Sequence, residues 1–560
     1  MLSNKTYRYL LFLLLVGLSH MAQAQQIKLE RADRLKSGRN AKGVYNRLIG
    51  DVHLSQNKTL IWCDSAYLYK STNLIEAYGH VRIKDRDSVT ISGNRLTYLG
   101  NERIARFREN VIFDNKQIRL YTDFLDYDRT RNLAYYFNEG KLVDSTNIVT
   151  SVKGYYRTNS RIMSFKKDVV LTNKQDSLLS DSLVYFTRTR IVKFVAPTKV
   201  YDPEGNVATY QDGTYNTDKD KSNLQEAKLE NDEYMLKGNR MILDGLRSYY
   251  KVDGNVYMLD KDDEVVITGS KAEHWKKRGI TQVYGPNALL KKAMGEGDTL
   301  YLSADTLISI DSKQPEKKRF LAFHNVRIYK GDMQALSDSL SYVIADSVLY
   351  FYQDPVLWTG KNQLLADSIN MEMRNNEIHK INMSTNSFMI MQDTTFIYNQ
   401  IKGRKMTLQF RESVLDRVHV DGNGESIYFA RDDESQTVVG MNKIVCSSML
   451  IRFKNQKADK VTFYAQPDAQ FIPPRQLSEP STKLKGFNWL EEFRPDLDLV
   501  LGLREAPERP KSTNTTTEGN RQTIPADPPP GGEEAPASDE GILPAGKKPA
   551  GLSPLVGGGD

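Results

Sequence analysis

The sequence predicts an all-β protein made of stacked strands, and two observations lead to that prediction. A short phrase, in which Gly, Asn, Asp or His precedes a valine and alternating apolar residues follow, recurs about every thirty residues. The chain also has 30 tyrosines and 39% apolar residues, a composition that suits half-buried strands. A fixed period in this range is typical of an array whose units bury their apolar faces only by stacking. We therefore expect function from a long surface or groove rather than from one pocket.

The valine phrase has six clear copies, and Val52, Val81 and Val111 lie 29 and then 30 residues apart. Weaker copies begin at Gly140 and Asp354. Gly-Asn and Gly-Asp pairs are typical of turns, so each unit is predicted to hold two or three strands of about five to eight residues separated by turns. The clear copies are Gly50–Leu54, Gly79–Ile83, Glu109–Phe113, Lys167–Leu171, Gly254–Met258 and His324–Ile328.

Between the valine phrases lies a second phrase, in which short polar residues around an aspartate precede a period-two apolar pattern. We interpret these aspartates as strand starts, where carboxylate side chains form local turns with the backbone. They recur at equivalent places, which a single catalytic site would not produce. The aspartates are Asp64, Asp181, Asp305, Asp338 and Asp367.

The valine phrases place an apolar row on one face of the strands. In the copy at 79–83, Val81 and Ile83 point to one side and Arg82 points to the other. The row is predicted to face the interior, either as a packed core between two sheets or as an apolar trough that takes acyl chains. The candidate lipid-binding residues are Val52, Leu54, Val81, Ile83, Val111, Phe113, Val169, Leu171, Val256, Met258, Val326 and Ile328.

The first 24 residues have the pattern of a secretory signal peptide. Lys5 and Arg8 form its basic region, residues 9–18 form its apolar region, and residues 22–24 form an A-x-A cleavage site. Glutamine rather than cysteine follows this site, which disfavours a lipoprotein anchor. No other apolar run approaches the length of a membrane-spanning helix. We expect the mature chain to be exported and soluble.

Composition divides the rest of the chain into three segments. The strand array is predicted over residues 25–470, with a possible seam at the polar, charge-rich stretch near 214–235. Residues 471–503 are predicted to be a capping segment, as an array with an open edge requires. Ten of the 20 prolines lie after residue 506, so residues 504–560 are predicted to be a disordered Pro/Gly-rich tail.

The residues give little support to catalysis or metal binding. The histidines are dispersed and none has metal-ligand spacing, and no phosphate-binding loop precedes a helix. Cys63 and Cys446, the only two cysteines, are predicted to be buried free thiols. The formal charge of +7 is far from the dense basic stripe of a nucleic-acid binder. We expect no enzyme activity, no cofactor, no metal and no nucleic-acid partner.

With these motifs identified, the chain resembles the OstA family, the organic-solvent-tolerance fold of the lipopolysaccharide transport proteins LptA, LptC and the N-terminal domain of LptD. The resemblance rests on the signal peptide and on the phrases at 254–258, 303–307 and 366–369, and it spans about residues 27 to 470. It implies an elongated β-jellyroll, or β-taco, of stacked antiparallel strands with an apolar interior. It also implies a periplasmic location and edge-strand docking to other lipopolysaccharide-transport components at the inner and outer membranes.

The function that this resemblance implies is lipopolysaccharide transport in outer-membrane assembly. The protein would bind lipopolysaccharide, or a related acylated lipid, and carry its lipid A acyl chains along an apolar groove between the inner and outer membranes. The alternative is a structural or adhesive exported β-solenoid with a dry core and no lipid ligand. Units of about thirty residues favour the first function, since rungs of a parallel β-helix are shorter and more uniform.

Overall fold

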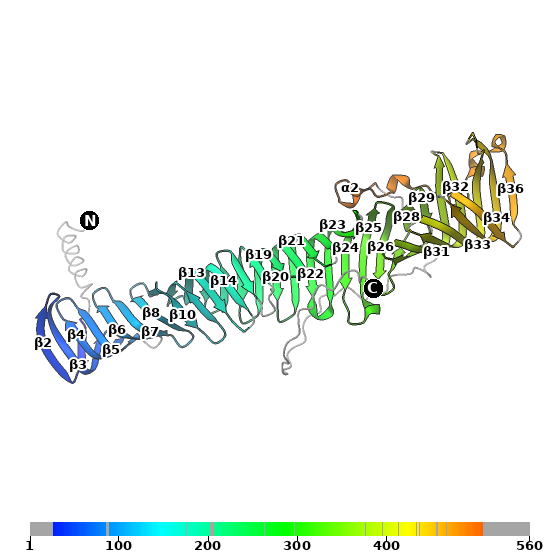
Figure 1. Ribbon diagram of the computed structural model, residues 1–560. Helices are drawn as coiled ribbons and strands as arrows, with labels where there is room; N and C mark the ends of the chain where they lie inside the picture. Colours follow the sequence, from blue (N-terminus) through cyan, green and yellow to red (C-terminus); the bar gives the residue numbers. More distant parts are fainter. Residues whose placement is uncertain are drawn as a thin grey trace, which may run out of the picture. The chain divides into compact units, whose positions relative to one another are not determined.

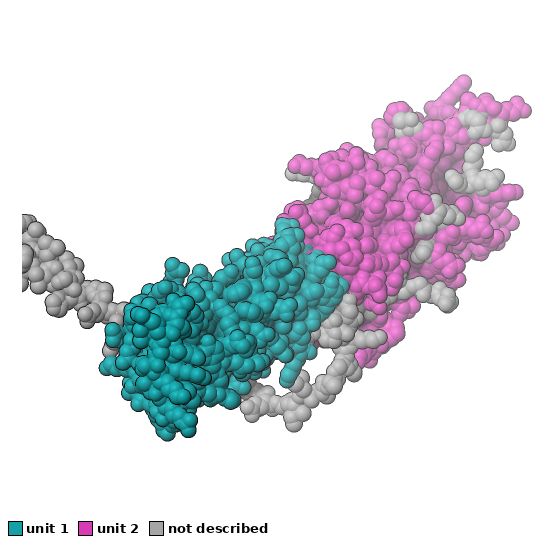
Figure 2. All heavy atoms as spheres, turned by 60° about the vertical axis from the view of Figure 1, so that its left-hand side comes forward, with its two compact units in different colours: residues 1–227 teal, residues 228–560 magenta. Residues whose placement is uncertain are grey.

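The computed structural model describes residues 26–85, 89–174, 176–201, 207–262, 264–295, 297–375, 377–394, 396–412, 414–432, 434–435, 437–454, 457–465 and 467–507. Of these residues, 72% lie in β-strands and 4% in helices, which confirms the all-β prediction. The predicted signal peptide, and the predicted tail from residue 508 onward, lie outside the described residues. The chain divides into two compact units, unit 1 (Met1–Ala227) and unit 2 (Lys228–Asp560), and their boundary falls inside the stretch 214–235 (Figure 2).

Unit 1 is a stack of antiparallel strands (Figure 1). Its strands are β1 (Lys28–Arg31), β2 (Arg34–Asn40), β3 (Gly43–Gln56), β4 (Thr59–Tyr69), β5 (Leu74–Asp85), β6 (Val89–Leu99), β7 (Ile104–Asp114), β8 (Arg119–Asp128), β9 (Leu133–Tyr136), β10 (Gly140–Val143), β11 (Ile148–Ser151), β12 (Lys153–Arg157), β13 (Ile162–Thr172), β14 (Ser177–Phe186), β15 (Ile191–Phe194), β16 (Thr198–Tyr201), β17 (Val207–Tyr210), β18 (Asp212–Asn216) and β19 (Lys221–Glu230), which crosses the unit boundary. Where two short strands replace one long strand, both pair with the same neighbour, as β9 and β10 do with β8.

Unit 2 has the same antiparallel architecture, with several longer strands. Its strands are β20 (Tyr234–Asp244), β21 (Tyr249–Asp260), β22 (Val265–Trp275), β23 (Ile280–Gly295), β24 (Asp298–Ile310), β25 (Arg319–Lys330), β26 (Met333–Val343), β27 (Val348–Tyr352), β28 (Val356–Thr359), β29 (Asn362–Leu365), β30 (Ser368–Arg374), β31 (Glu377–Thr394), β32 (Ile397–Arg411), β33 (Val414–Arg431), β34 (Val438–Lys454), β35 (Lys457–Tyr464) and β36 (Asp468–Ile472). The short helices are η1 (Lys276–Arg278), η2 (Pro315–Lys317), η3 (Pro474–Gln476), η4 (Glu479–Thr482), η5 (Glu491–Phe493) and α2 (Leu497–Val500).

The valine phrases mark corners inside long strands, and the prediction of turns between short strands is wrong at these places. At the corner of β3, Gly50 and Asp51 have φ angles of 78° and 40°, and the two residues together oppose the single residue Asp64 of β4. At the corner of β7, Glu109 and Asn110 have φ angles of 65° and 50°. Two successive left-handed residues form a bulge that bends the strand, while the ladder continues on both sides. The predicted strands of five to eight residues are therefore halves of strands such as β3, with 14 residues, and β7, with 11.

Most of the recurrent aspartates lie inside strands and face these corners from there. The prediction that they start strands is wrong for Asp64, Asp181, Asp305 and Asp338, whereas Asp367 does stand directly before β30. Asp64 lies in the middle of β4, and its carboxylate bonds the ring Nδ1 of His80 at 2.8 Å. An equivalent aspartate, Asp123 of β8, accepts a hydrogen bond from the backbone N–H of Asn110 at 3.0 Å. The left-handed pair turns backbone N–H groups away from the regular ladder. A carboxylate opposite the bulge can accept hydrogen bonds from them. Their recurrence follows from the recurrence of the corners.

The long strands of unit 1 each run from one rim of the fold, through a corner, to a second rim. Backbone hydrogen bonds join neighbouring turns along the second rim, as in the bond from the N–H of Arg129 to the carbonyl of Arg103 at 3.1 Å. We define rim A by the strand ends at Gln56, Asp85, Asn115 and Asp144. We define rim B by the turns at 70–73, 100–103, 129–132, 158–161 and 187–190.

Residues 473–503 follow β36 and lie against unit 2. In Figure 1 this stretch, coloured orange, passes from β36 back toward β25, and α2 contacts β24 and β25. Leu499 and Val500 of α2 are buried, at 3% and 0% exposed. The predicted capping segment therefore contributes apolar side chains to the interior of unit 2.

Candidate lipid groove

The twelve predicted groove residues all point into the interior of their own unit. Val52 and Val81 are fully buried, and even Met258, the most exposed of the twelve, is only 7% exposed. Arg82, on the opposite face of β5, is exposed. Side chains this buried pack against one another, so an acyl chain would reach them only after the surrounding walls separate. Their predicted contact with lipid stays a prediction.

A row of polar side chains, which we call the seam, joins rim A to rim B in unit 1. Each bond pairs a tyrosine near a rim B turn with an amide or carboxylate side chain of rim A. The partners are 41 or 42 residues apart in the sequence. The four bonds are Tyr98 to Gln56, Tyr127 to Asp85 at 3.2 Å, Asn115 to Tyr156 at 2.6 Å, and Tyr185 to Asp144 at 2.6 Å.

Two arginines of rim B add ion pairs to the seam. Arg129 reaches Asp85 at 2.8 Å, and each of these side chains is only 10% exposed. Arg190 reaches Asp144, whose side chain is fully buried, also at 2.8 Å. Removing one partner of a buried ion pair is strongly destabilising, because the remaining charge stays in a poorly solvated place. Removing any single charged partner from the seam should therefore lower the stability of unit 1.

Burial and hydrogen bonding set the protonation of the seam. Burial, together with the neighbouring carboxylates Asp85 and Asp144, raises the pKa of Tyr127 and that of Tyr185 to about 12. Burial by itself would raise the pKa of Asp144, but hydrogen bonds from Tyr185 and from Asn147 lower it below its ordinary value. At neutral pH the tyrosines therefore remain donors and Asp144 remains a charged acceptor.

Sequence reasoning missed the seam, although the seam leaves a signal in the sequence. Five tyrosines follow one another at intervals of 29 residues, and each stands at or next to the end of a strand, before a rim B turn. Their regular spacing is as clear as that of the valines. They are Tyr69, Tyr98, Tyr127, Tyr156 and Tyr185.

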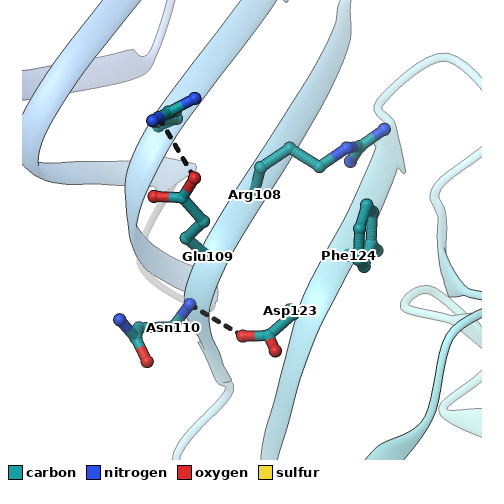
Figure 3. A pocket seen from close by; sticks show the side chains of 6 residues that line it. Arg108, Glu109, Asn110, Asp123 and Phe124 are labelled. Atoms are coloured by element: carbon teal, nitrogen blue, oxygen red, sulfur yellow. Dashed lines mark hydrogen bonds and ion pairs between the residues drawn. The ribbon is translucent and has the colours of Figure 1, made fainter.

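An open hollow lies beside the corner of β7. Glu109 forms an ion pair with Arg95 at 3.2 Å. Figure 3 shows the backbone N–H of Asn110 donating to Asp123. The guanidinium of Arg108 lies 5.3 Å from the ring centre of Phe124. The six lining residues are Arg95, Arg108, Glu109, Asn110, Asp123 and Phe124. Because these charges engage one another or the backbone, we interpret the hollow as a consequence of the corner geometry.

Both cysteines are free and buried, as predicted, with Cys63 in unit 1 and Cys446 in unit 2. Burial, together with the neighbouring Asp64 charge, raises the pKa of Cys63 to about 12. Within the described residues, no three or more His, Cys, Asp or Glu side chains are grouped so that they could hold a metal ion. None of the described helices has the length and apolar character needed to cross a membrane.

These features define a stacked antiparallel β-jellyroll whose interior is apolar and whose rims meet through side chains. Residues 24–181 and 159–239 match the family model described as OstA-like protein. The N-terminal part of the chain is therefore similar to OstA-like proteins, as its repeated phrases predicted.

Comparison with other proteins adds a distant likeness. No curated protein matches the chain. Among solved structures, LptH from Pseudomonas aeruginosa, the LptA homologous periplasmic component of the conserved lipopolysaccharide transport device, matches with 10% sequence identity and a TM-score of 0.19. The match covers 21% of this chain and 82% of that chain. A TM-score this low assigns no function to the chain.

Proposed function

We propose that this chain is a periplasmic carrier of lipopolysaccharide or a related acylated lipid, with the acyl chains held inside the jellyroll. The match of residues 24–181 and 159–239 to the OstA-like family model supports the proposal. So does the apolar row, because Val52, Val81 and Val111 follow one another on the interior face of unit 1. A row of aliphatic side chains offers an acyl chain the same environment that it has in a membrane. The proposal assigns no reaction to the chain.

The observation that carries this proposal is the way in which rim A and rim B of unit 1 are joined along the seam. Across the described residues of the seam, the bonds from rim to rim involve side chains, whereas backbone bonds run between neighbouring strands and turns. The two walls of unit 1, which end in rim A and rim B, can therefore separate along the seam without loss of a strand pair. A packed core that never opens needs no such division between backbone and side-chain bonding. A lipid carrier does, because its cargo must enter from the side.

The alternative, an exported structural β-solenoid with a dry core, has one observation in its favour. All twelve candidate residues are at most 7% exposed, as in an ordinary core. The two functions differ in whether the walls ever separate in the presence of lipid.

Site-specific photo-crosslinking separates these functions. A photoreactive amino acid at Val81 or at Val111, in the purified full chain mixed with lipopolysaccharide, should give a lipid adduct. The matched control is the same amino acid at Arg82, which is adjacent in sequence but exposed on the opposite face. Adducts at the two valines and none at Arg82 support the carrier. No adduct at any of the three positions would support the dry core, and equal adduct formation at all three would contradict selective binding inside the jellyroll.

We also propose that other lipopolysaccharide-transport components dock at the edge strands. The residues of β1 are all exposed, as are most of those of β2. Both strands pair with β3 on one side, and β2 carries three basic residues, which are Arg34, Lys36 and Arg39. Charged side chains on an edge strand prevent unselective pairing, so docking here would require an acidic or otherwise matched partner strand. Co-purification of a tagged full chain, with and without Lys36→Glu, tests this proposal, which predicts loss of the partner in the variant.

A further inference from the structure

One segment of unit 2, residues 477–503, lies across strands that precede it in the chain, and we call this segment the strap. Its apolar side chains point inward, with Leu490 at 6% and Phe493 at 7% exposed and Val500 fully buried. The lysines and glutamates of the strap are all exposed. The strap is therefore amphiphilic, with an apolar side toward unit 2 and a charged side toward solvent.

Two buried glutamines hold the backbone of the strap. The side-chain amide of Gln363, which is fully buried, donates to the carbonyl of Asn488 and accepts from the N–H of Leu490, both at 2.7 Å. Gln400, at 1% exposed, makes the same pair of bonds six residues earlier in the strap. Its partners are the carbonyl of Thr482 and the N–H of Leu484, both at 2.8 Å.

Further polar contacts continue this attachment toward the end of the strap. Arg494 donates through Nε to the side-chain oxygen of Gln334 at 2.8 Å, and Asn287 donates to the carbonyl of Val500 at 3.1 Å. Gln334 is also buried, at 4% exposed. A buried amide needs a hydrogen-bond partner, and the strap supplies partners along its length.

The surface of unit 2 beneath the strap is apolar. Leu484 of the strap completes one cluster, and Leu490 and Phe493 complete a second. The first cluster contains Phe388, Ile390, Ile427, Phe429 and Met441, and the second contains Val356 and Trp358. These wall residues would form an open apolar groove in the absence of the strap.

The strap is attached in a way that allows it to leave. Its described residues form η4, η5 and α2 but no strand, so side-chain amides and apolar packing hold it in place. By contrast, β36, immediately before it, pairs with β34 through the backbone ladder. Lifting the strap therefore leaves every strand pair of unit 2 intact.

We propose that the strap is a displaceable occupant of an acyl-chain site in unit 2, lined by the two clusters beneath it. This inference rests on the proposed lipid-carrier function and adds a second site, outside the region that matches the OstA-like family. The strap presents a line of apolar side chains inward and charges outward. An acylated lipid has the same arrangement, with an apolar chain and a polar head. An acyl chain can replace Leu484, Leu490 and Phe493 without exposing the walls to water. The site is then closed when empty and opens in exchange for cargo.

The test uses the full chain and palmitic acid that carries a diazirine, with labelled residues mapped by mass spectrometry. Leu490→Asp places a charge against Trp358 and should lift the strap, because an unpaired buried charge is costly. If the strap is closed most of the time in the wild type, releasing it should raise labelling of the two clusters by about tenfold or more. The control is Leu503→Asp, since Leu503 belongs to the same segment but is 72% exposed. This variant should label like the wild type.

Amide hydrogen exchange of the wild-type chain provides a second measurement, which does not depend on a variant that fails to fold. The N–H groups of Leu484 and Leu490 bond to glutamine side chains, so their exchange should accelerate when palmitic acid is added. Acceleration together with label in the two clusters supports the inference. Label confined to unit 1, or unchanged exchange at both amides, overturns it and leaves the proposed function standing. The absence of label anywhere in the chain overturns both.

Discussion

Replacing Tyr185 by phenylalanine tests the seam at one bond. The ring of Tyr185 is fully buried, and the substitution keeps the ring while removing the hydroxyl, so no large cavity forms. That hydroxyl donates to Asp144 at 2.6 Å and accepts from Arg190 at 3.4 Å. The substitution therefore removes a hydrogen bond to a buried charge, together with the longer bonds that the hydroxyl accepts from Arg190 and, at 3.5 Å, from Asn147.

The expected cost follows from the surroundings of Asp144. A hydrogen bond to a charged group contributes about 1.5–3 kcal/mol. Asp144 keeps its ion pair with Arg190 at 2.8 Å and its bonds from the N–H groups of Thr146 and Asn147, so its charge is not left unpaired. We therefore expect Tyr185→Phe to lower the free energy of unfolding of unit 1 by about 1.5–3 kcal/mol, and not by the larger amount typical of an orphaned buried charge.

The two cysteines make this free energy measurable unit by unit. Cys63 is buried in unit 1 and Cys446 in unit 2, so pulse labelling of thiols during guanidinium titration reports each unit separately. The control is Tyr201→Phe, which removes a hydroxyl from a tyrosine of unit 1 that is 37% exposed. A change at Cys63 in Tyr185→Phe no larger than that in the control, within about 0.5 kcal/mol, would refute the view that the seam holds the rims together.

Three further predictions address the charge of the seam, the corners and the groove. The pKa of Asp144 is lowered in the folded state, so its stabilisation is complete above the unfolded pKa of about 3.9 and is lost as pH falls through the folded value. The difference in unfolding free energy between the wild type and Asp144→Asn should thus be full at neutral pH and should shrink in acid, and a difference independent of pH would contradict this assignment. Gly79→Ala should destabilise unit 1 by about 1–3 kcal/mol, because Gly79 has a φ of +72° and a Cβ there would lie 2.3 Å from the carboxylate of Asp64. The control is Gly43→Ala, at a φ of +119° but with open space around the Cβ. If labelling of Cys63 gave the same loss of unfolding free energy in both variants, the contact with the Asp64 carboxylate would not matter. Val111→Thr keeps the side-chain shape and buries one hydroxyl at a cost of about 1–3 kcal/mol, so the fold should survive while lipopolysaccharide transfer falls. Unchanged transfer in a folded Val111→Thr protein would indicate a dry core.

The sequence alone determined the all-β class, the repeat and the inward-facing row. The reason is that a strand places alternate side chains on opposite faces, so the pattern around Val81 and Ile83 reports its own burial without knowledge of any partner. Both residues are indeed buried, at 0% and 1% exposed. The repeated phrases also predicted the similarity to OstA-like proteins that the N-terminal part of the chain shows.

Only the tertiary structure decided what the polar residues of the repeat do. Gly50 and Asp51 suit a turn and a mid-strand bulge equally, because both need left-handed backbone, and the pairing with Asp64 distinguishes the two. The same holds for contacts between distant residues. The hydroxyl of Tyr185 bonds to Asp144, 41 residues away in the sequence, and the side chain of Gln363 bonds to the backbone N–H of Leu490, 127 residues away. The tyrosine spacing marks one side of the seam, but no local pattern tells which distant residue a side chain will bond. The partners in the seam and in the strap therefore became visible only once the walls of each unit were in place.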